Sequence, residues 1–223
     1  MKTTLVISIV LLHCYQAHTQ SSAMVEQYYY TRTPGTDAMM TPMANFTSAN
    51  NWYGEARYNF DEINTFSLYA GRKFSGTGNV AWEATPLIGG LMGQMTGGSV
   101  GMNVGADYRK LFFLSQSQYS FSIENATDKY FYNWSELGYN ATSWLYAGVA
   151  VQQTNIYRSA GKLEPGCMIG FSFKNWSIPL YAFNTDRNER YFVLGFNWQW
   201  EGRKKTTRQE QVLTAEPQNY IYD

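Results

Sequence analysis

The sequence predicts an all-β protein, an antiparallel up-and-down barrel that crosses a membrane with its strands. Three observations lead to this prediction. Apolar and polar residues alternate with a period of two over most of the chain, as they do in β-strands. Aromatic residues make up 17% of the chain and charged residues only 15%, an unusual balance for a protein surrounded by water. The mean hydropathy of −0.38 is too low for a bundle of transmembrane helices.

An export signal opens the chain. Lys2 precedes an apolar run over residues 5–12, and the small or polar residues Ala17 and Thr19 follow it. This order is typical of a signal peptide. We therefore assign residues 1–19 to a leader that is removed after export.

Residues 20–51 are expected to form a periplasmic N-terminal arm. The segment is polar and dotted with methionine, and it contains the turn-forming sequences Thr33-Pro34-Gly35 and Asn50-Asn51. Neither a helical period nor a strand period continues for long within it, so no element of the barrel is expected there.

Residues 52–201 are expected to form the barrel. In the last strand one face is wholly apolar and carries Phe192, Leu194, Phe196, Trp198 and Trp200. The first strand repeats the pattern, with Trp52 and Tyr58 on one face and Tyr53, Glu55 and Arg57 on the other. The same rule holds in three further segments, at residues 102–109, 119–124 and 167–174.

The apolar faces are expected to point outward to lipid. A water-soluble barrel needs a charged outer face, whereas the polar faces here are rich in Gly, Ser and Asn. A membrane barrel instead carries an apolar exterior with aromatic girdles and a polar interior. The predicted location is therefore the bacterial outer membrane, with its lipid as the surrounding partner.

The strand count follows from the breaks in the alternation. Nine breaks divide the barrel into ten strands, and they lie at residues 60–64, 75–79, 89–98, 110–116, 125–129, 140–143, 158–166, 174–177 and 184–190. Eight strands with longer loops are the alternative. An even count puts both chain ends in the periplasm. We also expect a β-bulge near Ser135, and a bulge or a strand start at Pro179.

Inward-facing charges predict a polar network inside the barrel. Its expected members are Glu55, Arg57, Glu83, Asp107, Arg109, Glu124 and Lys174. Buried charges are usually paired, so this network is interpreted as structural rather than catalytic. Removal of the leader leaves no histidine and only Cys167 as cysteine, so no base is available to activate a nucleophile. We therefore expect no catalytic residues, no cofactor and no metal, and assign the methionines to packing.

Residues 202–223 are expected to form a polar periplasmic C-terminal tail. The cations Arg203, Lys204, Lys205 and Arg208 directly follow the last strand, where they could meet lipid phosphates or a protein partner. The 17 Lys and Arg residues balance 17 Asp and Glu residues, so nothing in the net charge favours nucleic acid.

The chain resembles the small outer-membrane β-barrels of Gram-negative bacteria, and in particular Bacteroidota members of that class. The resemblance lies in the signal peptide, the alternating aromatic strands and the sequences WYGEARY at residues 52–58 and WSELGYN at residues 134–140. It implies the fold and the outer-membrane location. Small barrel enzymes of this class rely on a histidine, which the exported chain lacks, so an enzyme is not expected.

The function predicted from these features is that of a non-enzymatic structural or accessory subunit of an envelope complex. The two terminal segments, residues 20–51 and 202–223, would contact other envelope proteins. The alternative is a narrow channel or a small-ligand-binding barrel for uptake or export. Because ten strands enclose an interior that side chains can largely fill, conductance is expected to be slight.

Overall fold

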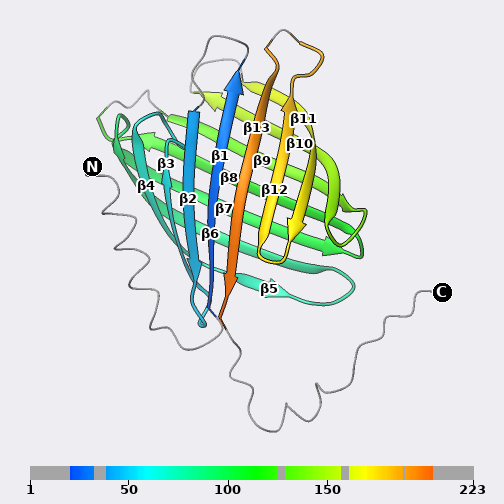
Figure 1. The fold of residues 1–223 in the computed structure, drawn as a ribbon. Helices are drawn as coiled ribbons and strands as arrows, with labels where there is room; N and C mark the ends of the chain where they lie inside the picture. Colours follow the sequence, from blue (N-terminus) through cyan, green and yellow to red (C-terminus); the bar gives the residue numbers. More distant parts are fainter. Residues whose placement is uncertain (1–20, 33–38, 125–128, 157–160, 188, 203–223) are drawn as a thin grey trace, which may run out of the picture.

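The protein is one antiparallel sheet closed into a barrel (Figure 1). The computed structural model describes residues 21–32, 39–124, 129–156, 161–187 and 189–202. The strands are β1 Ser22–Arg32, β2 Met39–Thr47, β3 Trp52–Tyr58, β4 Thr65–Arg72, β5 Phe74–Gly76, β6 Ala81–Gly93, β7 Gly97–Tyr108, β8 Leu111–Ser122, β9 Lys129–Asn140, β10 Leu145–Ile156, β11 Lys162–Phe173, β12 Trp176–Phe183 and β13 Tyr191–Glu201. Among these residues no helix is long and apolar enough to cross a membrane.

Two pairings close the ring. β1 lies beside β13, and the two strands pair along their whole length from Ser22 with Glu201 to Arg32 with Tyr191. On the far side, β4 pairs with β6. Consecutive strands pair elsewhere, so the backbone groups of each wall strand have neighbours on both sides, as a membrane interior requires.

The barrel wall consists of twelve strands, and β5 extends one of them. β4 and β5 keep the same register against β6, because Gly71 pairs with Leu87 and Phe74 pairs with Ala84. The interruption lies opposite Pro86, which has no N–H to donate to the ladder. β4 and β5 are therefore one strand broken by a proline on its partner.

The predicted count of ten strands is wrong, and so is the predicted periplasmic arm over residues 20–51. Ten strands do lie between residues 52 and 201, but β1 and β2 come from the supposed arm. The alternation is hidden there because the inner face of β2 carries the buried Met43 while its outer face carries the exposed Met40. Pro42 also breaks the pattern, yet it lies beyond the last residue pair of β2 with β3.

Neither predicted bulge is present. β9 pairs without a shift in register with both β8 and β10, and Trp134 and Glu136 simply point into the barrel. Pro179 lies inside β12 and pairs with Gly170 of β11. The register of β12 against β13 is unchanged on either side of Pro179, because the missing N–H interrupts the ladder without adding a residue.

The two ends of the barrel differ in their connections. β1 begins and β13 ends at the end of the barrel where the turns are short, at residues 48–51, 77–80, 109–110, 141–144 and 174–175. The opposite end carries loops that include residues 59–64 and 184–190. Outer-membrane barrels have short periplasmic turns and longer extracellular loops, which assigns the end bearing the termini to the periplasm. The predicted signal peptide and C-terminal tail lie outside the described residues.

The exterior is apolar, as the alternation predicted. Exposed aliphatic side chains such as Val149, Ile169 and Leu180 occupy the middle of the strands. A girdle of exposed rings lies at the periplasmic ends of the strands and includes Trp52, Trp82, Tyr108, Tyr139, Trp144, Trp176 and Trp200. Aromatic side chains at this position suit the interface between hydrocarbon and head groups.

One outward-facing patch on β8 and β9 is polar. Asn133 donates to the hydroxyls of Ser115 at 3.1 Å and Ser117 at 2.8 Å, and the Ser135 hydroxyl donates to Asn133 at 2.9 Å. These groups satisfy one another, which lowers the cost of placing them against lipid.

We predict that Val149→Arg lowers the free energy of unfolding by about 2–4 kcal/mol, because Val149 lies near the middle of β10 and faces lipid. Ser143→Arg is the matched control in the exposed periplasmic turn and should change it by less than about 1 kcal/mol. Denaturant titration of the protein folded in liposomes measures both values. Equal costs at the two positions would contradict the lipid-facing assignment of β10.

Candidate functional site

A cavity of about 570 Å³ lies in the barrel interior, and most of its lining residues are in the periplasmic halves of the strands. Its mouth is lined by residues at the periplasmic ends of the strands, including Ser22, Thr47, Lys73 and Lys174. Toward the extracellular side it reaches Tyr30 and Phe60. The volume falls within the range of pockets that bind small molecules.

The extracellular half of the interior is filled by side chains. Its largest fully buried members include Phe183, Leu91 and Val193. The rings of Phe183 and Tyr191 stack at 5.0 Å between centroids. Among the described residues, these side chains therefore obstruct the interior toward the extracellular end.

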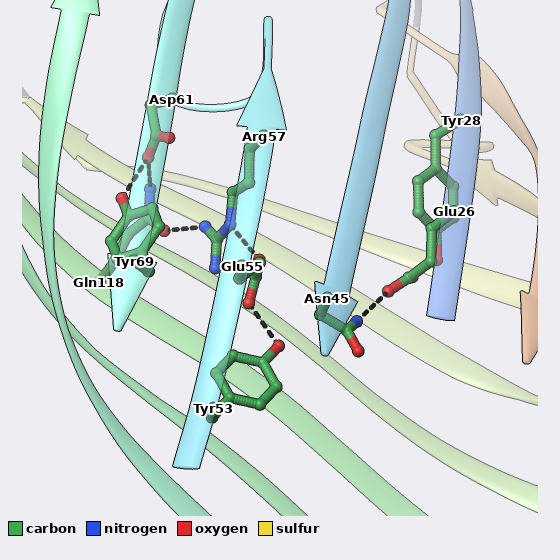
Figure 2. Close-up of polar contacts among 9 residues, drawn as sticks. All are labelled: Glu26, Tyr28, Asn45, Tyr53, Glu55, Arg57, Asp61, Tyr69 and Gln118. Carbon is green, nitrogen blue, oxygen red and sulfur yellow. Dashed lines mark hydrogen bonds and ion pairs between the residues drawn. The ribbon is translucent and has the colours of Figure 1, made fainter. Parts of the chain in front are cut away.

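Arg57 is the centre of a cluster of polar contacts at the boundary between the two halves, and Figure 2 shows its partners. Its side chain is 2% exposed and forms an ion pair with Glu55 on the same strand. Its guanidinium also donates to Gln118 Oε1 on β8. The Glu55 carboxylate accepts a second bond from the Tyr53 hydroxyl at 2.5 Å. Alternation places Tyr53, Glu55 and Arg57 on the inner face of β3.

The loop between β3 and β4 folds into the barrel and joins this cluster. Asp61 is buried, and its Oδ1 accepts bonds from the Tyr69 hydroxyl at 2.9 Å and from Gln118 Nε2. The Tyr130 hydroxyl donates to the backbone oxygen of Asp61 at 2.6 Å. Three strands thus hold one loop residue inside the lumen, since Tyr69, Gln118 and Tyr130 come from β4, β8 and β9.

The guanidinium of Arg57 also contacts two aromatic rings. It lies 4.7 Å from the ring centroid of Phe60 and 4.4 Å from that of Tyr69. Cation–π contacts of a desolvated arginine add to the ion pair and fix the plane of the guanidinium. We call Glu55, Arg57, Phe60, Asp61, Tyr69 and Gln118 the luminal plug.

Two further carboxylates lie on the floor of the cavity. Glu26 accepts from the Tyr28 hydroxyl at 2.9 Å and from Asn45 Nδ2 at 3.3 Å. Glu136 Oε1 accepts from Trp134 Nε1 and from the Tyr181 hydroxyl, each at 2.7 Å. Both carboxylates are held by neutral donors.

The predicted seven-residue network does not form as one unit. The structure brings together only Glu55 and Arg57. Glu83 forms its ion pair with Lys73, near the cavity mouth, and Lys174 also lies at that mouth. The remaining three lie apart from the plug, with Asp107 and Arg109 exposed at the periplasmic end and Glu124 exposed at the extracellular end.

Turn geometry explains part of this difference. Arg109 has φ 55° and Lys174 has φ 52°, and both occupy two-residue turns, at residues 109–110 and 174–175. Tight hairpins require positive φ at such positions. Extending the strand alternation through these turns therefore assigned Arg109 to the lumen incorrectly, whereas Lys174 does line the mouth of the cavity. The predicted surface cations Arg203, Lys204, Lys205 and Arg208 lie outside the described residues.

Sequence reasoning missed several members of the site. Glu26, Tyr28 and Asn45 belong to β1 and β2, which were not recognised as strands. Asp61 lies in a loop, where no period marks which side chains turn inward. Gln118 could have been found, because it shares the inner face of β8 with Ser120.

Metal binding has no support in the described residues. No group of three or more His, Cys, Asp or Glu side chains there is arranged to hold a metal ion.

Comparison with known proteins identifies the fold. No protein-family model matches the chain, and no curated protein sequence matches it. Among solved structures, the KdgM porin matches with a TM-score of 0.58 and 11% identity, over 78% of this chain and 98% of that chain. A KdgM porin in complex with disordered oligogalacturonate gives a TM-score of 0.59 at the same identity and coverage. The NanC porin gives a TM-score of 0.55, again with 11% identity over 78% of this chain and 98% of that chain.

At this level of identity the similarity shows the fold alone, which the chain shares with these porins. Together with the closed ring and the apolar exterior, it places the protein in the bacterial outer membrane, as the sequence predicted.

We predict that Arg57→Met lowers the free energy of unfolding by about 3–5 kcal/mol, because Glu55 would keep a buried charge without its partner. The double variant Arg57→Met/Glu55→Gln should recover part of that loss, since it removes the charge of Glu55 but leaves the buried carboxylate of Asp61, which also interacts with Arg57. Denaturant titration in liposomes, followed by tryptophan fluorescence, compares the two. A double variant as unstable as the single one would show that the ion pair is not the main contribution of Arg57.

Proposed function

We propose that the protein is a narrow outer-membrane channel that is closed in this conformation by the luminal plug. The observation that carries the proposal is the cavity of about 570 Å³, which opens at the periplasmic end and stops at the plug. Twelve strands enclose more space than the ten that the sequence predicted, and here that space is divided between a cavity and a barrier.

The chemistry of the barrier supports a plug that can open. Arg57, Asp61 and Gln118 hold it through polar contacts, which can be exchanged for contacts with water. Asp61 Oδ2 is buried without a hydrogen-bond partner among the described residues. An unsatisfied carboxylate oxygen raises the free energy of the closed arrangement, so rotation of Asp61 toward water recovers a bond.

The accessory-subunit hypothesis has lost one of its premises. It required residues 20–51 to reach partners in the periplasm, but β1 and β2 complete the barrel wall. Contact of the C-terminal tail with envelope proteins stays a prediction of the sequence, as does the Bacteroidota assignment. The porin fold favours the channel alternative.

The solute of this channel differs from that of the KdgM complex. Oligogalacturonate is an acidic saccharide, and anions are bound by lumens with excess positive charge. In the interior described above, Glu26, Glu55, Asp61 and Glu136 outnumber the single buried cation, Arg57. We propose that acidic saccharides are excluded.

We predict that Asp61→Ala raises single-channel conductance in planar bilayers several-fold, because the loop at residues 59–64 loses its bonds to Tyr69 and Gln118. Glu62→Ala is the matched control, since it removes the same charge from an exposed neighbour in the same loop. Wild-type protein and the control should show slight conductance.

Two results would count against the proposed channel. Large, stable steps from wild-type protein would show that the lumen is not closed by the plug. An Asp61→Ala variant that keeps heat-modifiable gel mobility, and is therefore folded, but conducts no better than Glu62→Ala would show that the plug does not gate a path.

A further inference from the structure

The floor of the cavity carries two carboxylates that form no ion pair within the part of the chain that the structure describes. Glu26 is 7% exposed and Glu136 is 8% exposed, and both line the cavity. Each is bonded only to neutral donors in the contacts described above. Glu26 lies close enough to Glu55 and Glu136 to be repelled by both, and it is attracted by Arg57, which is already paired with Glu55. A buried carboxylate of this kind needs a proton or a bound cation to balance it.

The positively charged side chains of the lumen either form ion pairs with other carboxylates or lie at the mouth of the cavity. Arg57 is paired with Glu55, and Lys73 is paired with Glu83. Lys174 is exposed in the periplasmic turn at the mouth. The floor of the cavity therefore favours a positively charged occupant.

The cavity walls are aromatic. Tyr28, Phe112, Trp134, Tyr146 and Tyr181 all line it. The Trp134 and Tyr181 rings meet edge to face with centroids 5.0 Å apart, and the Phe112 and Tyr146 rings do so at 5.7 Å. Aromatic walls bind an apolar body, and their faces attract an ammonium group.

In the part of the chain that the structure describes, no three His, Cys, Asp or Glu side chains are grouped to hold a metal ion, so an inorganic metal ion is a poor match for the floor of the cavity.

We propose that the cavity is a binding site for a protonated organic amine with an apolar or aromatic body, which enters from the periplasmic end. Its ammonium group would sit between Glu26 and Glu136, and its body would lie against Trp134 and Tyr181. This inference rests on the proposed channel for the biological use of the site, because the amine would be its solute. The binding itself requires only the closed conformation.

Isothermal titration calorimetry on the full-length protein, folded in detergent, tests the proposal with 2-phenylethylamine as the probe. The neutral analogue 2-phenylethanol has nearly the same shape and should bind about tenfold more weakly or not at all, because it lacks the charge. Glu26→Gln and Glu136→Gln should each weaken amine binding by about tenfold, since each removes one charge-assisted contact.

Glu164→Gln is the matched control variant. Glu164 is also buried, at 6% exposure, but it forms an ion pair with Lys162 at 2.8 Å at the start of β11, near the extracellular end. This variant should bind the amine like the wild type. Gel mobility checks that every variant is folded.

Several results would overturn the inference. One is that the alcohol binds as tightly as the amine, and another is that Glu164→Gln loses as much amine affinity as Glu26→Gln and Glu136→Gln do. A third is that potassium chloride at the same concentration as the amine displaces it fully. If Asp61→Ala conducts while the amine does not bind, the site fails and the channel stands. If the amine binds as expected and no variant conducts, the channel fails and the site stands.

Discussion

The structure depends on closing a β-sheet in lipid, where no water is present to bond an open edge. Every backbone N–H and C=O in the hydrocarbon must find a partner within the sheet. Here the ring is completed by β1, which pairs with β13 on one side and β2 on the other. The segment with the weakest strand pattern is thus indispensable to the wall, and the barrel has the circumference of twelve strands because of it.

The circumference in turn sets how the interior must be filled. Eight strands leave an interior just filled by side chains, and sixteen or more leave an open aqueous channel. A twelve-strand barrel lies between these cases, and in this chain side chains fill the two halves of the barrel interior to different extents. The extracellular half is packed around Phe183, Tyr191 and the luminal plug, whereas the periplasmic half retains a cavity.

Much of the wall could be predicted from the sequence, because the period of two is imposed by the pleat and by the contrast between lipid and lumen. The faces of β3 and β13 were assigned correctly, and the alternation along β3 placed Glu55 and Arg57 inside the barrel, where they form an ion pair. The pattern fails where both faces carry similar residues, as Met40 and Met43 do in β2. It also carries no information beyond the strand ends, so Arg109 was misplaced and Asp61 was missed. Contacts across the lumen, such as Tyr181 with Glu136, depend on barrel circumference and could not be read from one strand.

The central claim is that the lumen is open to the periplasm and closed toward the cell exterior by the luminal plug. It is tested most directly by cysteine labelling in a Cys167→Ala background, in cells that lack general porins. Leu114→Cys places a thiol in the cavity, and Ile63→Cys places one on the exposed extracellular loop. With a membrane-impermeant maleimide, the account predicts that intact cells label only the Ile63→Cys protein, and that opened cells label both. Labelling of the Leu114→Cys protein from outside intact cells, or its failure to label in opened cells, would contradict the account.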